Sequence, residues 1–147
     1  MKSPAILHSV RNALMGHPVR RVALLMLCFP YFLSGIHKIV DFDAGVAEMT
    51  SYVLLPAAPY AAATILIQVG CPLLIITGFC RWIGALVLAL FTIAAAFIAH
   101  PFWAVQKAEY YTTVQAFSED LAIAGGFLLI TWYALHKYRN KGEDDWA

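Results

Sequence analysis

Three short stretches of the sequence carry most of the polar side chains that border its apolar segments on one side. Imidazole, ammonium and carboxylate groups occur there close to aromatic rings. The residues that could bind a ligand are His37, Lys38 and Asp41 in the first stretch, His100 and Trp103 in the second, and Glu119 and Asp120 in the third. Polar groups of this kind in an apolar setting suit a small molecule with a carbonyl-bearing ring. The three stretches are therefore a candidate ligand site if the fold brings them together.

Gln68 adds a fourth polar group, and it lies deeper in apolar sequence than the others. It follows Tyr60 by eight residues, which places it about 12 Å further along a helix that rises about 1.5 Å per residue. A polar group at that depth needs a partner inside the protein, because hydrocarbon offers none. We therefore expect Gln68 to face the interior beneath the three stretches.

Composition defines the class of protein that must position these residues. The chain has 147 residues, of which 61% are hydrophobic, and its mean hydropathy is +0.70. A soluble core of that size does not need so much apolar surface. The sequence predicts an integral membrane protein whose surroundings are the lipid bilayer.

Four apolar segments are long enough to cross a bilayer, which takes about 20 helical residues. They lie at about residues 21–40, 60–80, 82–101 and 119–136. We therefore predict an all-α fold, an integral membrane four-helix bundle that forms one domain over residues 1–147.

The distribution of Lys and Arg predicts the orientation of this bundle. Cytoplasmic flanks of membrane helices are rich in these residues. One side of the predicted bundle carries Lys2, Arg11, Arg20, Arg21, Arg81, Lys137, Arg139 and Lys141, and the other carries Lys38 and Lys107. Both termini are predicted to be cytoplasmic, in a multi-pass protein of the plasma (inner) membrane. The three polar stretches then meet at the outer mouth of the bundle.

Two further helices are predicted outside the spanning segments. Apolar residues recur at helical spacing over about residues 4–15, which predicts a helix on the inner membrane surface. A short outer helix is predicted over about residues 43–54, with Asp43 as its N-cap. Ser118 is predicted to be the N-cap of the fourth membrane helix.

The polar residues also have interpretations that require no ligand. Lys38 and Asp41 can extend to the lipid headgroups, and His100 can end the third helix. Glu119 and Asp120 can stabilise the start of the fourth helix through its dipole. Because a charge beside low dielectric is costly when alone, we expect Lys38 to pair with Asp41, Glu119 or Asp120.

Several kinds of partner and cofactor are not expected. The net charge of +1 and the lack of a basic run argue against nucleic acid as a partner. The three cysteines lie in apolar segments without paired spacing, so neither a disulfide framework nor a metal site is predicted. His37 and His100 lie at matched depth and could in principle ligate a haem, but two lone histidines are more typical of hydrogen-bonding residues.

The order of four motifs resembles the DoxX-like family of small membrane proteins over about residues 32–130. The motifs are Ser34-Gly35-Ile36-His37-Lys38-Ile39 with Asp41, Thr77-Gly78-Phe79-Cys80-Arg81-Trp82 with Gly84 and Ala85, His100-Pro101-Phe102-Trp103, and Phe117 to Asp120 followed by Leu121-Ala122 and Gly125-Gly126. The resemblance implies a four-helix bundle associated with redox complexes. Some relatives resemble subunits of thiosulfate:quinone oxidoreductases, and others resemble membrane partners of enzymes that handle thiols or superoxide.

This chain departs from the family pattern at two places. The second helix commonly has an acid where Gln68 stands, and the fourth often begins with Lys-Asn where Glu119 and Asp120 stand. The altered charge puts in doubt any family role that depends on these positions.

Three functions remain open from the sequence. The leading hypothesis is an accessory subunit of a redox complex, noncatalytic or weakly catalytic by itself, with an outer-leaflet pocket for a quinone-like or other small amphipathic ligand. The alternatives are a noncatalytic membrane scaffold or assembly factor and a small transporter. Redox-enzyme subunits and further copies of the chain are the protein partners considered.

Overall fold

The computed structural model describes residues 16–144, and over this range the chain forms helices and no strand. The helices are α2 (His17–Val40), α3 (Phe42–Ser51), α4 (Ala57–Thr77), α5 (Arg81–Ala99) and α6 (Tyr110–Asp144). Four of these helices have stretches that are long and apolar enough to cross a membrane: Pro18–Val40, Ala57–Thr77, Arg81–Ala99 and Tyr110–Arg139. The predicted all-α fold with four membrane helices is thereby confirmed. The helix predicted over residues 4–15 lies outside the described residues.

The fourth membrane helix starts much earlier than the sequence predicted, because α6 begins at Tyr110 and not near residue 119. The hydroxyls of Thr112 and Thr113 both donate to the Glu109 carbonyl, at 2.8 Å each, and stabilise the first turn. Ser118 is therefore not an N-cap. Its hydroxyl donates to the Gln115 carbonyl at 2.7 Å inside the helix. The predicted start was wrong because the helix begins in residues 110–118, before the apolar segment from which the span was predicted.

The short helix α3 follows α2 after a single residue. Its N-cap is Asp41, whose Oδ1 accepts a hydrogen bond from the Ala44 backbone nitrogen at 2.9 Å, so the predicted cap at Asp43 was wrong. Met49 of α3 packs against Ala57 and Ala61 of α4. This small apolar cluster holds α3 against α4. The short outer helix was predicted over about residues 43–54, and α3 spans Phe42–Ser51.

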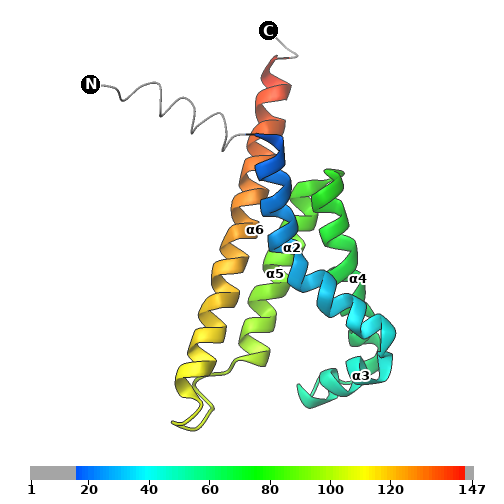
Figure 1. Cartoon of the computed structure of the whole chain (residues 1–147), viewed down its shortest axis with the longest axis vertical. Coiled ribbons are helices and arrows are strands. Elements are labelled where there is room, and N and C mark those ends of the chain that lie inside the picture. The colour runs from blue at the N-terminus through cyan, green and yellow to red at the C-terminus, as the bar shows by residue number, and fades with distance from the viewer. Residues whose placement is uncertain (1–15, 145–147) are drawn as a thin grey trace, which may run out of the picture.

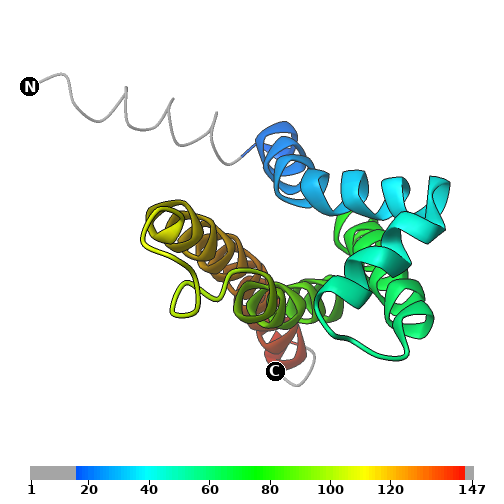
Figure 2. The same ribbon diagram turned by 90° about the horizontal axis from the view of Figure 1, so that it is seen from below.

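The membrane helices separate toward the end of the molecule at which α3 lies, here called the α3 end (Figure 1). The other end, called the Arg81 end, contains the start of α2, the turn between α4 and α5, and the last turns of α6. Seen from the α3 end, α2, α3 and α4 lie on one side and α5 and α6 on the other (Figure 2). Helix α2 changes direction about halfway along, where Pro30 removes a backbone hydrogen bond.

The apolar core lies where the helices are still close together. Its fully buried side chains include Cys28, Ile75, Leu88 and Phe127, one from each membrane helix. The ring of Tyr31 meets Phe127 edge-on, with centroids 5.4 Å apart. Helix α2 therefore contacts α6 up to the level of Tyr31 and diverges from it beyond that residue.

Two glycines allow α4 to approach its neighbours closely. A Cβ at Gly35 of α2 would lie 2.7 Å from Val69 Cγ2 and 3.2 Å from Gln68 Cβ. A Cβ at Gly84 of α5 would lie 2.8 Å from the Cys71 carbonyl oxygen. The contacts with Val69 Cγ2 and with the Cys71 oxygen would be closer than packed atoms tolerate. The two glycines thus hold α4 against α2 and α5, and the first contact is directly beside Gln68.

Candidate functional site

The centre of the candidate site is the amide of Gln68, in the middle of α4. The residue is only 8% exposed, and its Oε1 has no hydrogen-bond partner among the described residues. A buried acceptor without a partner costs about 1–3 kcal/mol. Gln68 also lines two neighbouring cavities. The unpartnered oxygen at this position is therefore able to accept a hydrogen bond from a ligand or from water.

The first cavity, called the His100 cavity, has a volume of about 230 Å³ and lies among the four membrane helices. Its polar residues are Tyr31, Gln68, Thr92, His100 and Asp120, and Phe91 is one of its apolar residues. Tyr31 and Thr92 are hydrogen-bonded to each other through their hydroxyls. The Thr92 hydroxyl also donates to the Leu88 carbonyl at 2.7 Å. The divergence of α2 beyond Pro30 leaves room for this cavity.

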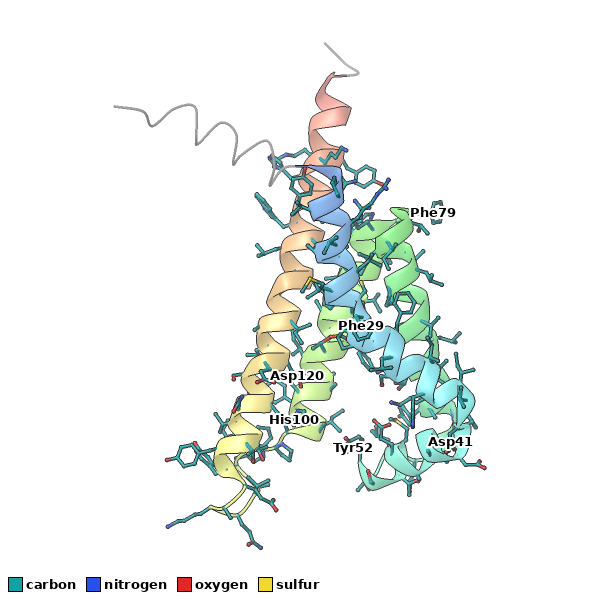
Figure 3. The ribbon with its side chains drawn as sticks, in the orientation of Figure 1. Phe29, Asp41, Tyr52, Phe79, His100 and Asp120 are labelled. Carbon is teal, nitrogen blue, oxygen red and sulfur yellow. The ribbon has the colours of Figure 1, made fainter. Side chains whose placement is uncertain are left out.

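His100 and Asp120 form a polar pair at the α3 end of this cavity (Figure 3). His100 is the C-cap of α5, and its Nδ1 lies 3.1 Å from Oδ2 of Asp120 on α6. Both side chains are about one-third exposed. A neutral imidazole that donates from Nδ1 presents Nε2 as an acceptor, and a protonated imidazole forms an ion pair with the carboxylate. The pair can therefore accept a proton beside the cavity.

The second cavity, called the Tyr52 cavity, has a volume of about 310 Å³ and lies between α3, α4 and α5. Glu48, Tyr52 and Tyr60 contribute polar groups, whereas most of the other residues are apolar. Burial, and to a smaller extent the Glu48 carboxylate, raise the pKa of Tyr52. Its phenol therefore stays protonated at neutral pH and can donate a hydrogen bond. The two cavities share Gln68, Phe91, Ala95 and Ala99, so they adjoin at the unpartnered amide.

Lys38 is buried and pairs with a residue that the sequence analysis did not select. Its Nζ lies 2.8 Å from Glu48 Oε2 and donates to the Ser34 hydroxyl at 2.9 Å. The expectation that Lys38 pairs with Asp41, Glu119 or Asp120 was wrong. Helix α3 folds back along α2, so that Gly45 covers the methylene groups of Lys38 and Glu48 reaches the ammonium. The sequence signal for this contact is the spacing of Gly45 and Glu48, which places both residues on one face of a helix.

The remaining candidates lie outside both cavities. His37 and Asp41 are exposed, and Asp41 is occupied as the cap of α3. Glu119 is exposed and accepts a hydrogen bond from Gln115 Nε2 at 2.9 Å. Trp103 is 58% exposed and its ring lies 5.0 Å from that of Phe102. Of the predicted residues, only Gln68, His100 and Asp120 line a cavity, and Lys38 touches the site through Glu48.

Several polar residues that line the two cavities were not predicted from the sequence: Tyr31 and Thr92 in the His100 cavity, and Glu48, Tyr52, Tyr60 and Thr64 in the Tyr52 cavity. Tyr31 and Thr92 lie inside apolar helices, where a lone hydroxyl is an available signal for an inward-facing position. Tyr52 is the C-cap of α3, and the sequence pattern gives no signal that it lines a cavity. Within residues 16–144 there is no group of three or more His, Cys, Asp or Glu side chains that could hold a metal ion. His37 lines neither the His100 cavity nor the Tyr52 cavity.

Comparisons with known proteins place this chain in a family. The family model described as DoxX matches residues 21–101, which is more than half of the chain. Inner membrane protein YphA of Escherichia coli (strain K12) is 28% identical over 114 residues, which cover 76% of this chain and 78% of that protein. No solved structure matches the chain. The matched range contains Gln68 and His100, whereas Asp120 lies beyond it.

Proposed function

This chain belongs to the DoxX family, and we propose that it is a multi-pass inner-membrane protein that binds a small amphipathic molecule between its helices at the α3 end. Its relative in Escherichia coli is named an inner membrane protein, and the four apolar helices fit the same location. We further propose that both termini are cytoplasmic, because Arg20, Arg81 and Lys137 line one cavity at the Arg81 end. The α3 end then belongs to the outer leaflet.

The observation that carries this proposal is the unpartnered Oε1 of Gln68. An acceptor requires a donor, so the ligand should present a hydroxyl or N–H group at the shared wall of the two cavities. The surrounding rings and alanine side chains favour an apolar body around that group. A quinol has both properties, and the oxidised quinone ring could in turn accept from the amide nitrogen of Gln68 or the Tyr52 phenol.

The route to the site also suits a membrane-dissolved molecule. Tyr60 and Ile98 line the Tyr52 cavity, and they are 46% and 43% exposed. Both lie in helices that cross the apolar layer, so the surface that they expose faces lipid. A molecule dissolved in the bilayer could therefore reach Gln68 without crossing water.

His100 and Asp120 would serve the same ligand as a proton acceptor. Oxidation of a quinol releases protons from its hydroxyl groups, and the imidazole and carboxylate lie in the cavity that Gln68 lines. The electrons would pass to a partner redox complex, which the family resemblance implies. In this proposal the chain is an accessory subunit that holds the ligand and takes up its proton.

Substitution Gln68→Leu tests the proposal, because it should weaken ligand binding without destabilising the unliganded protein. Leucine removes the unpartnered oxygen but keeps a side chain of similar size. The affinity for a short-chain quinol analogue should fall about tenfold, the value of one good hydrogen bond, while the unliganded protein should be as stable as before or more so. Gln115→Leu makes the same change on the exposed side of α6 and should leave affinity unchanged.

Binding can be measured by titration of the detergent-purified protein, with mass spectrometry of copurified lipids as an independent readout. Copurified quinone that is lost in Gln68→Leu would support the proposal. Equal affinity of the wild type and Gln68→Leu for the analogue, with no quinone copurified, would contradict it.

A further inference from the structure

A second concentration of polar side chains lies at the Arg81 end, far from the site proposed for the amphipathic ligand. Two neighbouring cavities of about 210 Å³ and 330 Å³ occur there, and Arg20 of α2 and Arg81 of α5 line both. Lys137, Tyr133 and Tyr138 of α6 line the first, and Arg21 lines the second. Cationic groups from three helices thus converge on one place.

Arg81 is held in position by the end of α4. Its Nε donates to the Ile75 carbonyl at 2.8 Å, one of the last carbonyls of that helix. The next residue after α4, Gly78, has φ +86°, and a Cβ there would lie 3.0 Å from Arg81 Nη2. The guanidinium therefore lies across the glycine and is fixed by Nε, while its terminal nitrogens remain available as a fork of donors.

The described part of the chain supplies no acid to this cluster. Neither cavity is lined by a described Asp or Glu, and the ion pairs among the described side chains involve Lys38 and His100 at the α3 end. Like charges held together beside low dielectric repel one another. An anion placed among Arg20, Arg81 and Lys137 would attract all three cations and so offset their repulsion. It would be bound by several charge-assisted hydrogen bonds.

We propose that the Arg81 end is a binding site for a phosphate-bearing anion, with the arginine fork and Lys137 on the phosphate oxygens and the hydroxyls of Tyr133 and Tyr138 as further donors. A phosphate offers several oxygens, which a guanidinium fork and an ammonium can bind together. The phosphate can come from an anionic phospholipid headgroup or from free phosphate. Leu24 and Leu25 line the second cavity, which gives an acyl chain an apolar surface beside the cations, as at basic pockets between membrane helices.

The test compares the full chain in nanodiscs of phosphatidylcholine alone with nanodiscs that also contain phosphatidylglycerol, each with and without inorganic phosphate. Retained phosphatidylglycerol is counted by native mass spectrometry, and phosphate binding is read from the shift in unfolding temperature. The variants are Arg20→Gln with Lys137→Gln, both at exposed positions. At about fivefold per cation near a membrane surface, the double variant should lose roughly 25-fold in affinity.

Arg139→Gln is the matched control, because it removes one cation at the same end from a residue that lines neither cavity. Retention of phosphatidylglycerol that phosphate does not displace identifies a lipid headgroup, and stabilisation by phosphate in phosphatidylcholine identifies free phosphate. Either result supports the site if the double variant loses it and Arg139→Gln does not. The proposal is overturned if neither phosphate source binds, or if one loss of charge at Arg139 weakens binding as much as the double variant does.

Discussion

Lys38 and Glu48 form an ion pair of 2.8 Å that joins the end of α2 to the face of α3. The two partners differ greatly in exposure, since the Lys38 side chain is 7% exposed and that of Glu48 is 41%. Glu48 can therefore be solvated without the lysine, whereas Lys38 depends on Glu48 and the Ser34 hydroxyl. This asymmetry makes the pair a structural anchor of α3 beside the Tyr52 cavity.

Glu48→Gln should destabilise the protein more than Lys38→Met does. The first change leaves a buried ammonium without its counter-charge, which costs about 1–3 kcal/mol when only one partner of the pair is open to water. The second leaves a carboxylate that water can reach, and its methionine refills the space of the lysine stem. Chemical unfolding in detergent measures both. Equal losses for the two variants would contradict the asymmetry, and Glu109→Gln, an exposed acid in the loop before α6, is the control.

The hydrogen bond between His100 and Asp120 should couple α5 to α6 at the α3 end. In a double-mutant cycle with His100→Gln and Asp120→Asn, the coupling energy should be about 1 kcal/mol, as for a polar pair whose side chains are about one-third exposed. The parallel cycle with Glu119→Gln in place of Asp120→Asn should give none, because Glu119 is directed away and bonds Gln115. A coupling at Glu119 as large as that at Asp120 would exclude the described geometry.

The sequence could predict that Lys38, His100 and Asp120 lie toward the same end of the bundle, but it could not predict the direction in which each side chain points. The lengths of the apolar runs place His37 and Lys38 at the same level of the bilayer, yet adjacent helical residues differ by about 100° in direction, and only Lys38 is buried. Glu119 and Asp120 also differ in direction, since Glu119 is exposed and Asp120 lines the His100 cavity. For Gln68 the sequence could predict the direction as well, because a strongly polar side chain in the middle of an apolar helix has to face inward.

The partners of these residues depended on tertiary structure that the sequence pattern does not contain. Glu48 reaches Lys38 only because α3 folds back after a single residue. The hydroxyls of Tyr31 and Thr92 meet because α2 and α5 come together, 61 residues apart in the chain. Such contacts follow from the direction of a turn and the angle of a kink, and neither is encoded in hydrophobic periodicity.

Gly35→Ala should destabilise the bundle although alanine is the better helix former. The added Cβ would lie 2.7 Å from Val69 Cγ2, and overpacking of this kind costs about 1–3 kcal/mol. Gly125→Ala is the control, because a Cβ there meets nothing within 4 Å, so it should be neutral or stabilise by up to about 1 kcal/mol. Unfolding experiments compare the two. Val69→Ala combined with Gly35→Ala should recover most of the loss, and a failure to recover would show that the contact lies elsewhere.

Tyr52 should make the stability of the protein sensitive to alkaline pH. Burial and the Glu48 carboxylate raise the pKa of Tyr52 above its usual value near 10, so the folded state binds the phenolic proton more tightly than the unfolded state. The resulting stability is fully present below about pH 10 and is lost as the pH rises through the folded pKa. Tyr52→Phe should show a smaller loss of stability over that range, measured as the decrease in unfolding temperature from neutral to alkaline pH.

Glu48→Gln separates the two causes of this shift. Loss of the carboxylate should lower the pKa of Tyr52 partway toward 10, because burial is the larger cause and remains. The pKa is measured from the change in absorbance as the phenols ionise. Subtracting the titration of the matching Tyr52→Phe variant leaves the contribution of Tyr52 alone. A Tyr52 pKa that is unchanged in Glu48→Gln would show that the carboxylate does not act on the phenol, whereas a full return to 10 would show that Tyr52 is more open to water than the Tyr52 cavity implies.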